Sequence, residues 1–402
     1  MPSPALLLCS VLVFLSGFRT PDPSFRKVEP LPKTPYVQVR GGLPNAFRAM
    51  SEKKKATVAF LGGSITFNPG WRDKVSAYLQ ERFPDTRFTF IKAGIPSLGS
   101  LPHAFRFQQD VAGQGTPDLL FLEAAVNDRV NETDSLTQLR ALEGIVRQAR
   151  RLNPDMDIVL MSFVDPDKLA DFAANRVPAE IANHERVAAH YGLPSINPAR
   201  EVYDRIKAGE FSWEGDFKDL HPSPFGQELY FQTIRYLLET APAKPAGKPV
   251  SPKKTAALNP TSFDKGRYLP LETAYLQTGW KRLENWHPAD AVGTRPGFVD
   301  RPVLEALTPG AVLSLPFSGS AVGMAVVSGP DAGVVEYRID GGPYRKMDLY
   351  TQWSHLLHLP WYKLFAEDLP AKNHVLDLRI SSQKNPKSAG TACRIVYFLV
   401  NG

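Results

Sequence analysis

The sequence predicts two domains, a three-layer α/β domain with a parallel sheet followed by an all-β, sandwich-like domain. Two observations lead to this prediction. Between Thr57 and about Glu239, short apolar runs alternate with segments whose apolar residues recur at helical spacing. A Pro-rich stretch then separates this region from a C-terminal part in which short β-branched runs lie between Gly, Pro and Asp. A chain of 402 residues is also long enough for two apolar cores.

The first region contains apolar runs that we predict to be strands of one sheet: residues 57–63, 87–94, 118–126, 157–164 and the shorter 193–197. The segments between and after them place apolar residues on one helical face: Val75, Leu79 and Phe83; Leu139, Leu142, Ile145, Val146 and Ala149; Ile181, Val187 and Ala188; Leu229, Ile234 and Leu237. Buried parallel strands are continuous apolar runs joined by crossover helices. We therefore predict an α/β domain over residues 56–240, with active-site groups at the carboxyl ends of its strands.

The boundaries of the remaining segments follow from composition. Residues 20–55 are expected to form an extended segment before the α/β domain. Residues 241–262 are predicted to be an exposed, semi-rigid spacer, because the stretch 241–260 has five prolines and no acidic residue. Residues 263–402 are predicted to be the β-sandwich, with a hairpin across Asp340 and Gly341.

The N-terminus predicts export. The apolar run from Ala5 to Phe18 has the length of a secretory signal, so residues 1–19 are predicted to be cleaved, with an uncleaved anchor as the alternative. Cleavage would leave Cys393 as the one cysteine and exclude an intrachain disulfide. Export without a disulfide favours a secreted or periplasmic bacterial protein. We expect no stable membrane insertion once the signal is cleaved.

Composition indicates a soluble globular protein, because 43% of the residues are hydrophobic and 22% are charged. The net charge is +6, but Lys and Arg are interleaved with acidic residues along the chain. We therefore expect no nucleic-acid partner.

Ser64 is the first candidate catalytic residue. It follows an apolar strand and two glycines, and a helix is predicted to begin near Trp71. A nucleophilic serine needs an exposed oxygen at a strand end, and glycines there permit a sharp turn with free amide groups. A phosphate-binding loop or a plain turn would use the same residues.

Three further motifs follow predicted strands. The second strand ends in KAGIPSLGS, where Gly94 and Gly99 could offer a backbone N–H. The third ends in EAAVNDRVN, where the Asn127 amide could donate to an oxyanion, although a helix cap or Asx-turn is an equal alternative. His221 lies in the loop sequence DLHPSPFG before the last helix. A lone histidine is usually structural, but here four polar groups converge on one sheet edge.

This ordered set, GGSIT, KAGIPSLGS, VND and DLHPSPFG, resembles the SGNH/GDSL hydrolase family over roughly residues 55–240. The resemblance implies a flavodoxin-like esterase domain with Ser64 as nucleophile and His221 as general base. It also implies an oxyanion hole made by the Ser64 amide, a glycine amide (Gly94 or Gly99) and the Asn127 side chain. Acyl transfer to Ser64 would be followed by attack of water activated by His221, with no cofactor and no metal.

One position departs from the family pattern. The family usually has an acid three residues before the histidine, and Lys218 stands there. We favour Asp219 as the residue that orients the imidazole, with Asp216 as the alternative. A Ser-His dyad would need neither of these two carboxylates. The histidine pairs His184 and His190, and His355 and His358, lack the spacing of metal ligands.

These observations leave three functions open. The first is an esterase that removes acyl groups, above all acetyl groups, from a carbohydrate-like or other small ester substrate. The second is a lipase or thioesterase of the same fold, and the third is a non-catalytic carbohydrate-binding protein. Aromatic residues of the C-terminal domain could stack on sugars, although packing inside the sandwich is the more frequent role: Trp280, Trp286, Tyr350, Trp353, Trp361 and Tyr362.

Overall fold

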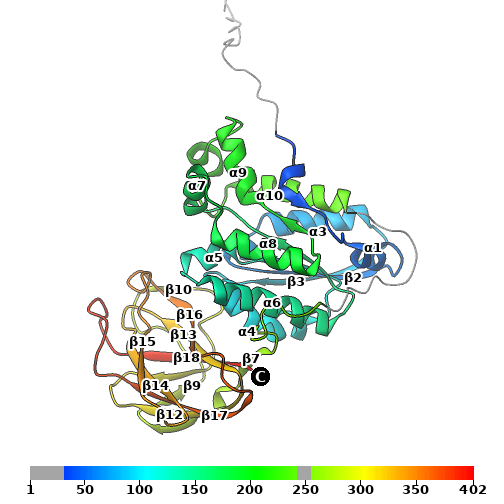
Figure 1. The fold of residues 1–402 in the computed structure, drawn as a ribbon. Coiled ribbons are helices and arrows are strands. Elements are labelled where there is room, and N and C mark those ends of the chain that lie inside the picture. The colour runs from blue at the N-terminus through cyan, green and yellow to red at the C-terminus, as the bar shows by residue number, and fades with distance from the viewer. Residues whose placement is uncertain (1–30, 242–254) are drawn as a thin grey trace, which may run out of the picture.

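The computed structural model describes residues 31–241 and 255–402, which form two domains lying against each other (Figure 1). The α/β domain comes first and the β-rich domain second, as the sequence predicts. The predicted signal peptide and residues 242–254 of the predicted spacer lie outside the described residues.

The α/β domain is built on one sheet with strand order β1-β6-β5-β4-β2-β3. Its strands are β1 (Val37–Gln38), β2 (Lys55–Gly62), β3 (Arg87–Gly94), β4 (Leu119–Glu123), β5 (Asp157–Met161) and β6 (Ser195–Ile196). All neighbours pair in parallel except β1 with β6. Because β3 and β4 follow β2 on its opposite sides, the order is flavodoxin-like, and ligands of such sheets bind at the carboxyl ends beside this reversal.

Helices cover both faces of the sheet. They are α1 (Pro44–Ser51), α2 (Ser64–Phe67), α3 (Trp71–Arg82), α4 (Ser100–Asp110), α5 (Ala125–Val130), α6 (Ser135–Leu152), α7 (Pro166–Ala173), α8 (Ala179–Tyr191), α9 (Pro198–Lys207) and α10 (Pro224–Thr240). Alternate strand residues point to opposite faces. Ala59 and Leu61 pack with α4, α6 and α8, whereas Val58 and Phe60 pack with α1, α3, α9 and α10. Short 3-10 or π turns add η1 (Thr34–Tyr36), η2 (Ala112–Gln114) and η3 (Trp213–Phe217).

Two sequence-based boundaries need correction. The described part of residues 20–55 is not simply extended, because it forms β1 and helix α1, whose Phe47 and Met50 are buried in the core. The end of the predicted spacer is docked on α6. There the Glu143 carboxylate accepts the N–H groups of Leu258 and Asn259, the latter at 2.8 Å. Buried apolar contacts and backbone hydrogen bonds thus order both segments.

The C-terminal domain is a sandwich of mostly antiparallel strands. One sheet has the order β10-β16-β13-β18-β11-β9, with β7 also pairing with β18, and the other has the order β15-β14-β17-β12-β8. The strands are β7 (Gly266–Leu269), β8 (Tyr275–Thr278), β9 (Lys281–Leu283), β10 (Gly293–Thr294), β11 (Val303–Ala306), β12 (Val312–Gly319), β13 (Ala321–Ser328), β14 (Val334–Ile339), β15 (Arg345–Asp348), β16 (Leu357–Ala366), β17 (Lys372–Ile380) and β18 (Cys393–Asn401). A 3-10 turn, η4 (Leu271–Thr273), lies between β7 and β8. The antiparallel pairing of β14 with β15 confirms the predicted hairpin.

The two domains share an apolar core. Phe105 of α4, Phe263 after the spacer and Leu399 of β18 belong to one buried cluster. Polar contacts add to it, because Arg140 of α6 pairs with Glu367 at 2.7 Å and with Asp368 at 2.8 Å. The β-rich domain is therefore fixed against the α4–α6 face of the sheet.

Within residues 31–241 and 255–402, we find no helix with the length and apolar character needed to cross a bilayer.

Candidate active site

Ser64 and His221 come together at the carboxyl edge of the sheet. Ser64 is the first residue of α2, directly after β2, and His221 lies in the loop between η3 and α10. The Nε2 atom of His221 lies 2.8 Å from the hydroxyl oxygen of Ser64. The imidazole is 43% exposed, so the pair is open to solvent and to a substrate. A neutral ring with an unprotonated Nε2 could accept the serine proton.

The structure distinguishes the two candidate acids. Asp219 Oδ1 lies 3.6 Å from His221 Nδ1, and this carboxylate also accepts the backbone N–H of His221. Asp216 instead accepts the backbone N–H of Ser212 at 2.8 Å and its hydroxyl at 3.0 Å. Asp219 is therefore the carboxylate beside the imidazole, although 67% of its side chain is exposed. Lys218 adopts a positive φ of 81° just before it.

The surroundings of His221 favour its neutral form. Burial lowers the pKa of the imidazole, Asp219 opposes this shift, and the positive charge of Arg295 lowers the pKa further. Arg295 belongs to the β-rich domain and follows β10 directly. Sequence reasoning missed this contribution, because no local pattern relates residue 295 to residue 221.

Gly99 and Asn127 lie together on one side of Ser64. A side-chain carbon on Gly63, the residue before Ser64, would stand 2.0 Å from Asn127 Oδ1, and one on Gly99 would stand 3.2 Å from the Asn127 carbonyl carbon. As the residues that begin α2 and precede α4, Ser64 and Gly99 have amide groups outside the helical hydrogen-bond ladders. The three predicted donors therefore surround the turn that carries the serine.

Gly94 has a different position. A side-chain carbon on it would stand 2.5 Å from the backbone nitrogen of Phe67, so Gly94 permits α2 to pack against the end of β3. Gly99 is therefore the glycine that lies against Asn127. Gly94 instead supports α2, the helix that begins with Ser64.

Asn127 does not stand at a strand end, because β4 ends at Glu123 and α5 begins at Ala125. Glu123 Oε1 accepts the N–H of Val126 at 3.2 Å, which turns the chain into the helix. The apolar run continues through Val126 without Gly or Pro, so the sequence pattern offered no break. Burial raises the pKa of Glu123 to about 7, while hydrogen bonds from Val126 and Gly63 oppose the shift.

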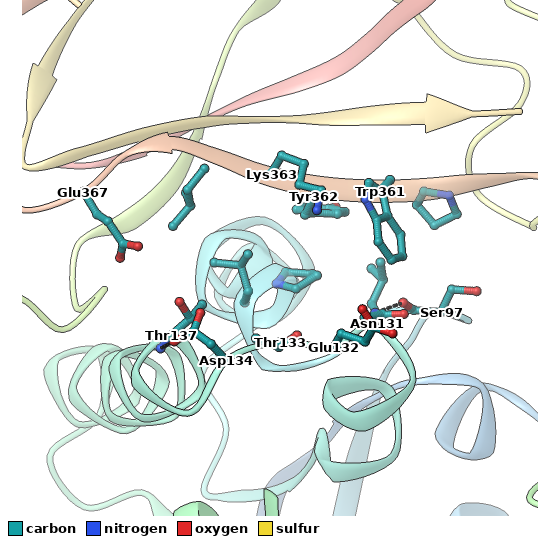
Figure 2. Close-up of a pocket in the computed structure, with 15 residues that line it drawn as sticks. Ser97, Asn131, Glu132, Thr133, Asp134, Thr137, Trp361, Tyr362, Lys363 and Glu367 are labelled. Carbon is teal, nitrogen blue, oxygen red and sulfur yellow. Dashed lines mark hydrogen bonds between the residues drawn. The ribbon is translucent and has the colours of Figure 1, made fainter. Parts of the chain in front are cut away.

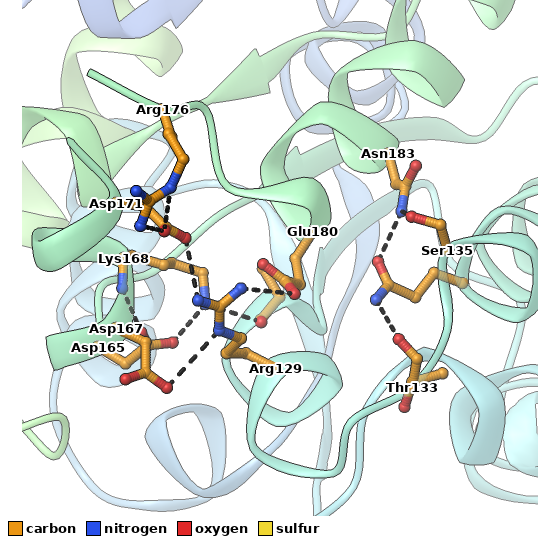
Figure 3. Close-up of polar contacts among 12 residues, drawn as sticks. Arg129, Thr133, Ser135, Asp165, Asp167, Lys168, Asp171, Arg176, Glu180 and Asn183 are labelled. Atoms are coloured by element: carbon orange, nitrogen blue, oxygen red, sulfur yellow. Dashed lines mark hydrogen bonds and ion pairs between the residues drawn. The ribbon is translucent and has the colours of Figure 1, made fainter. Parts of the chain in front are cut away.

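A charged network that the sequence did not reveal holds α5 in place (Figure 3). Arg129 follows Asn127 and Asp128 and contacts Asp171 at 3.0 Å, Asp167 at 3.6 Å and Glu180 at 3.6 Å. Lys168, which is fully buried and paired with Asp165, donates to the Ala125 carbonyl at 2.9 Å. Helices α7 and α8 thereby fix the helix that carries Asn127.

The remaining histidines and the cysteine have other surroundings. His184 is buried, its Nδ1 lies 2.8 Å from the Glu180 carbonyl, and burial lowers its pKa to about 4. His190 contacts the Ala256 carbonyl, and His358 contacts Asp290. Cys393 is buried, and burial raises the pKa of its thiol. In the described parts of the chain, no three His, Cys, Asp or Glu side chains are grouped as metal ligands.

A cleft between the domains begins beside the oxyanion candidates (Figure 2). Ser97 and Leu98, just before Gly99, form part of its wall, and Trp361 and Lys363 of β16 face them from the β-rich domain. Its lining combines the polar residues Asn131, Glu132, Asp134 and Glu367 with apolar residues such as Leu101 and Leu364. Of the predicted sugar-stacking aromatics, Trp361 and Tyr362 line this cleft, Trp361 half-buried and Tyr362 buried, whereas Trp286 is buried outside the lining.

Comparison with known proteins agrees with the two-domain fold. Residues 60–229 match the GDSL-like Lipase/Acylhydrolase family. A search among curated proteins gave no match. The solved structure of a two-domain esterase (CEX) active on acetylated mannans aligns with a TM-score of 0.75 at 21% identity, covering 92% of this chain and 98% of that one. The same esterase co-crystallized with mannopentaose aligns with a TM-score of 0.74 at 21% identity and equal coverage.

A third solved structure aligns with about half of this chain. It is a catalytic mutant of an acetylxylan esterase from Geobacillus stearothermophilus, 17% identical, which covers 47% of this chain and 94% of its own with a TM-score of 0.40. The two-domain alignments show that the whole fold, including the β-rich domain, occurs in another protein.

Proposed function

We propose that this chain, whose residues 60–229 form a GDSL-like lipase/acylhydrolase domain, is an exported serine esterase that removes acetyl groups from a carbohydrate. The observation that carries the proposal is the 2.8 Å contact between Ser64 Oγ and His221 Nε2 at the carboxyl edge of the sheet. A hydroxyl and an imidazole so arranged, beside free amide groups, are the parts that acyl transfer requires.

In the proposed reaction, Ser64 Oγ attacks the ester carbonyl carbon while His221 Nε2 takes the hydroxyl proton. The Ser64 and Gly99 amides and the Asn127 side chain would stabilise the resulting oxyanion. His221 then gives its proton to the departing sugar hydroxyl, which leaves Ser64 acetylated. Water, deprotonated by His221, attacks the acyl-serine, and His221 returns this proton to Ser64 Oγ as acetate is released. Asp219 would orient the ring and stabilise its charged form.

The charged groups in the lining of the interdomain cleft favour a sugar substrate over a lipid. Glu132, Asp134 and Lys363 present charged groups where a long acyl chain would need apolar surface, and Trp361 adds an aromatic wall. The activity of the two-domain esterase on acetylated mannans makes such a mannan the first substrate to test. The N-terminal apolar run is consistent with a substrate outside the cytoplasm.

Acetate release from acetylated mannan, xylan, pectin, sialic acid and aryl acetates tests the proposal, with aryl butyrate and octanoate in parallel. We expect acetate to be released by the wild type and Ser64→Ala to lose the activity by at least about 10⁴-fold without a change in thermal stability. Preference for octanoate would favour a lipase. Binding of glycan with no turnover, unchanged in Ser64→Ala, would favour the non-catalytic alternative.

A further inference from the structure

The turn that presents Gly99, residues 97–100, is held at both ends by residues of one other segment. The Asp128 carboxylate accepts the backbone N–H of Ser100 at 2.8 Å and its hydroxyl at 2.9 Å. Asn131 Nδ2 donates to the Ser97 carbonyl at 2.9 Å. Asp128 is fully buried, whereas Asn131 follows α5 and is half-buried.

Gly99 lies against Asp128, between the bonds at Ser97 and those at Ser100. A side-chain carbon on Gly99 would stand 2.4 Å from Asp128 Oδ1 and 3.0 Å from the Asp128 nitrogen. Ser97 has a φ of 70°, a left-handed conformation that a non-glycine residue keeps only with support from its surroundings. The Asn131 bond supplies such support at the carbonyl of Ser97 itself.

We propose that Asp128 and Asn131 are positioning residues that fix the Gly99 amide relative to the Asn127 side chain. This inference rests on the proposed function, because it assigns the geometry of the oxyanion hole to two residues outside it. Oxyanion donors act only when they stand within hydrogen-bond reach of the position the oxyanion will occupy. The segment 127–131 carries Asn127 and also holds the turn of Gly99. The distance between the Asn127 side chain and the Gly99 amide is therefore kept constant.

The opposite end of the sheet offers matched controls. Asp157 accepts the backbone N–H groups of Asn45 at 2.9 Å and Ala46 at 2.8 Å at the start of α1, whereas Asp128 accepts one backbone N–H and one hydroxyl, both of Ser100, at the start of α4. Asn153 Nδ2 donates to the Pro117 carbonyl at 2.9 Å, which matches the bond of Asn131. Substitutions at 157 and 153 therefore remove comparable bonds far from Ser64.

The kinetic test uses the full chain and an aryl acetate, which has no glycan to touch the cleft, with active sites titrated by a serine-reactive phosphonate. We expect Asp128→Ala and Asn131→Ala to lower kcat per titrated site by about tenfold or more, less than the roughly 10²–10³-fold of losing a donor, with little change in KM. Asp128→Asn keeps an acceptor oxygen and should retain most of the activity. Asp157→Ala and Asn153→Ala should leave kcat per site unchanged.

A double-mutant cycle separates positioning from general stability. If Asp128 acts through the oxyanion hole, Asp128→Ala should cost less in an Asn127→Ala background than alone, whereas Asn153→Ala should be additive with Asn127→Ala. Additive effects of Asp128→Ala would overturn the proposal. Should Asp128→Ala fail to fold, Ser100→Ala removes one bond to the same carboxylate and serves in its place.

Hydrogen exchange gives a readout independent of turnover. Peptides that cover residues 97–100 should exchange faster in Asp128→Ala and Asn131→Ala than in the wild type or the controls. Equal exchange rejects the inference whatever the activity. A wild type that hydrolyses no ester rejects the proposed function instead, and a wild type that hydrolyses aryl acetate while both variants keep full kcat per site rejects the positioning role alone.

Discussion

Arg295 of the β-rich domain lies close enough to His221 of the α/β domain for its positive charge to lower the pKa of the imidazole. The backbone N–H of Arg295 donates to the His358 carbonyl at 3.0 Å, which ties the residue to β16. Its Nε is buried and has no hydrogen-bond partner among the described residues. The accessory domain thus contributes to the electrostatics of the catalytic pair as well as to the cleft wall.

This relationship predicts the pH dependence of turnover. The neutral imidazole is the active form, and its pKa lies below the ordinary value of 6.5, so activity should fall only as the pH drops through a midpoint below 6.5. Arg295→Gln removes a charge that lowers the pKa, and the acidic midpoint of kcat/KM should move to higher pH. Profiles of kcat/KM against pH for an aryl acetate measure the shift. Arg345→Gln, an exposed cation of β15, is the control, and an unmoved midpoint in Arg295→Gln contradicts the assignment.

Asp219→Asn should shift the same midpoint in the opposite direction. The Asp219 carboxylate raises the pKa of His221, so its neutralisation lowers the midpoint further. It should also slow kcat by about 10- to 100-fold, less than the roughly 10⁴-fold known for a buried triad acid, because Asp219 is 67% exposed and 3.6 Å from the ring. Asp216→Asn alters only the contacts with Ser212 and should change kcat little. A larger effect at 216 than at 219 would reassign the acid.

The residues of the candidate site could be predicted from the sequence where a short motif beside them marks the end of a strand or the start of a helix. Ser64 and His221 stand next to glycines or prolines that mark the ends of elements, and the alternation of apolar runs predicts the sheet edge on which they meet. Asp128, Asn131 and Arg295 act on residues distant in the sequence, and no periodicity or turn motif encodes those contacts. Helix α5 was missed for a related reason, since β4 ends at the buried Glu123, whose carboxylate accepts the Val126 N–H, and not at a breaking residue such as Gly or Pro.

Trp361 provides a test of the cleft. If a glycan lies along this wall, Trp361→Ala should raise KM for acetylated mannan by roughly 3- to 10-fold, the loss of about one aromatic contact, while kcat/KM for an aryl acetate stays the same. Tyr275→Ala is the control, because Tyr275 is 69% exposed on β8 of the sandwich and outside the cleft lining. Equal loss on both substrates would show a disturbed fold rather than a lost sugar contact.

Arg140 tests how firmly the domains are joined. Its guanidinium is 8% exposed and bonds to Glu367 at 2.7 Å and to both Asp368 oxygens at 2.8 and 2.9 Å. Arg140→Ala removes these charge-assisted bonds and should lower the free energy of unfolding by about 1–3 kcal/mol in urea titrations. Arg235→Ala breaks an exposed pair with Glu239 inside α10 and a contact with the ring of Tyr78, and it should lower the free energy of unfolding less than Arg140→Ala does. Because the cleft and Arg295 depend on the same docking, Arg140→Ala should also move the acidic midpoint toward that of Arg295→Gln. If the two Arg→Ala variants had equal free energies of unfolding, the apolar cluster around Phe105 and Phe263, and not Arg140, would hold the domains together.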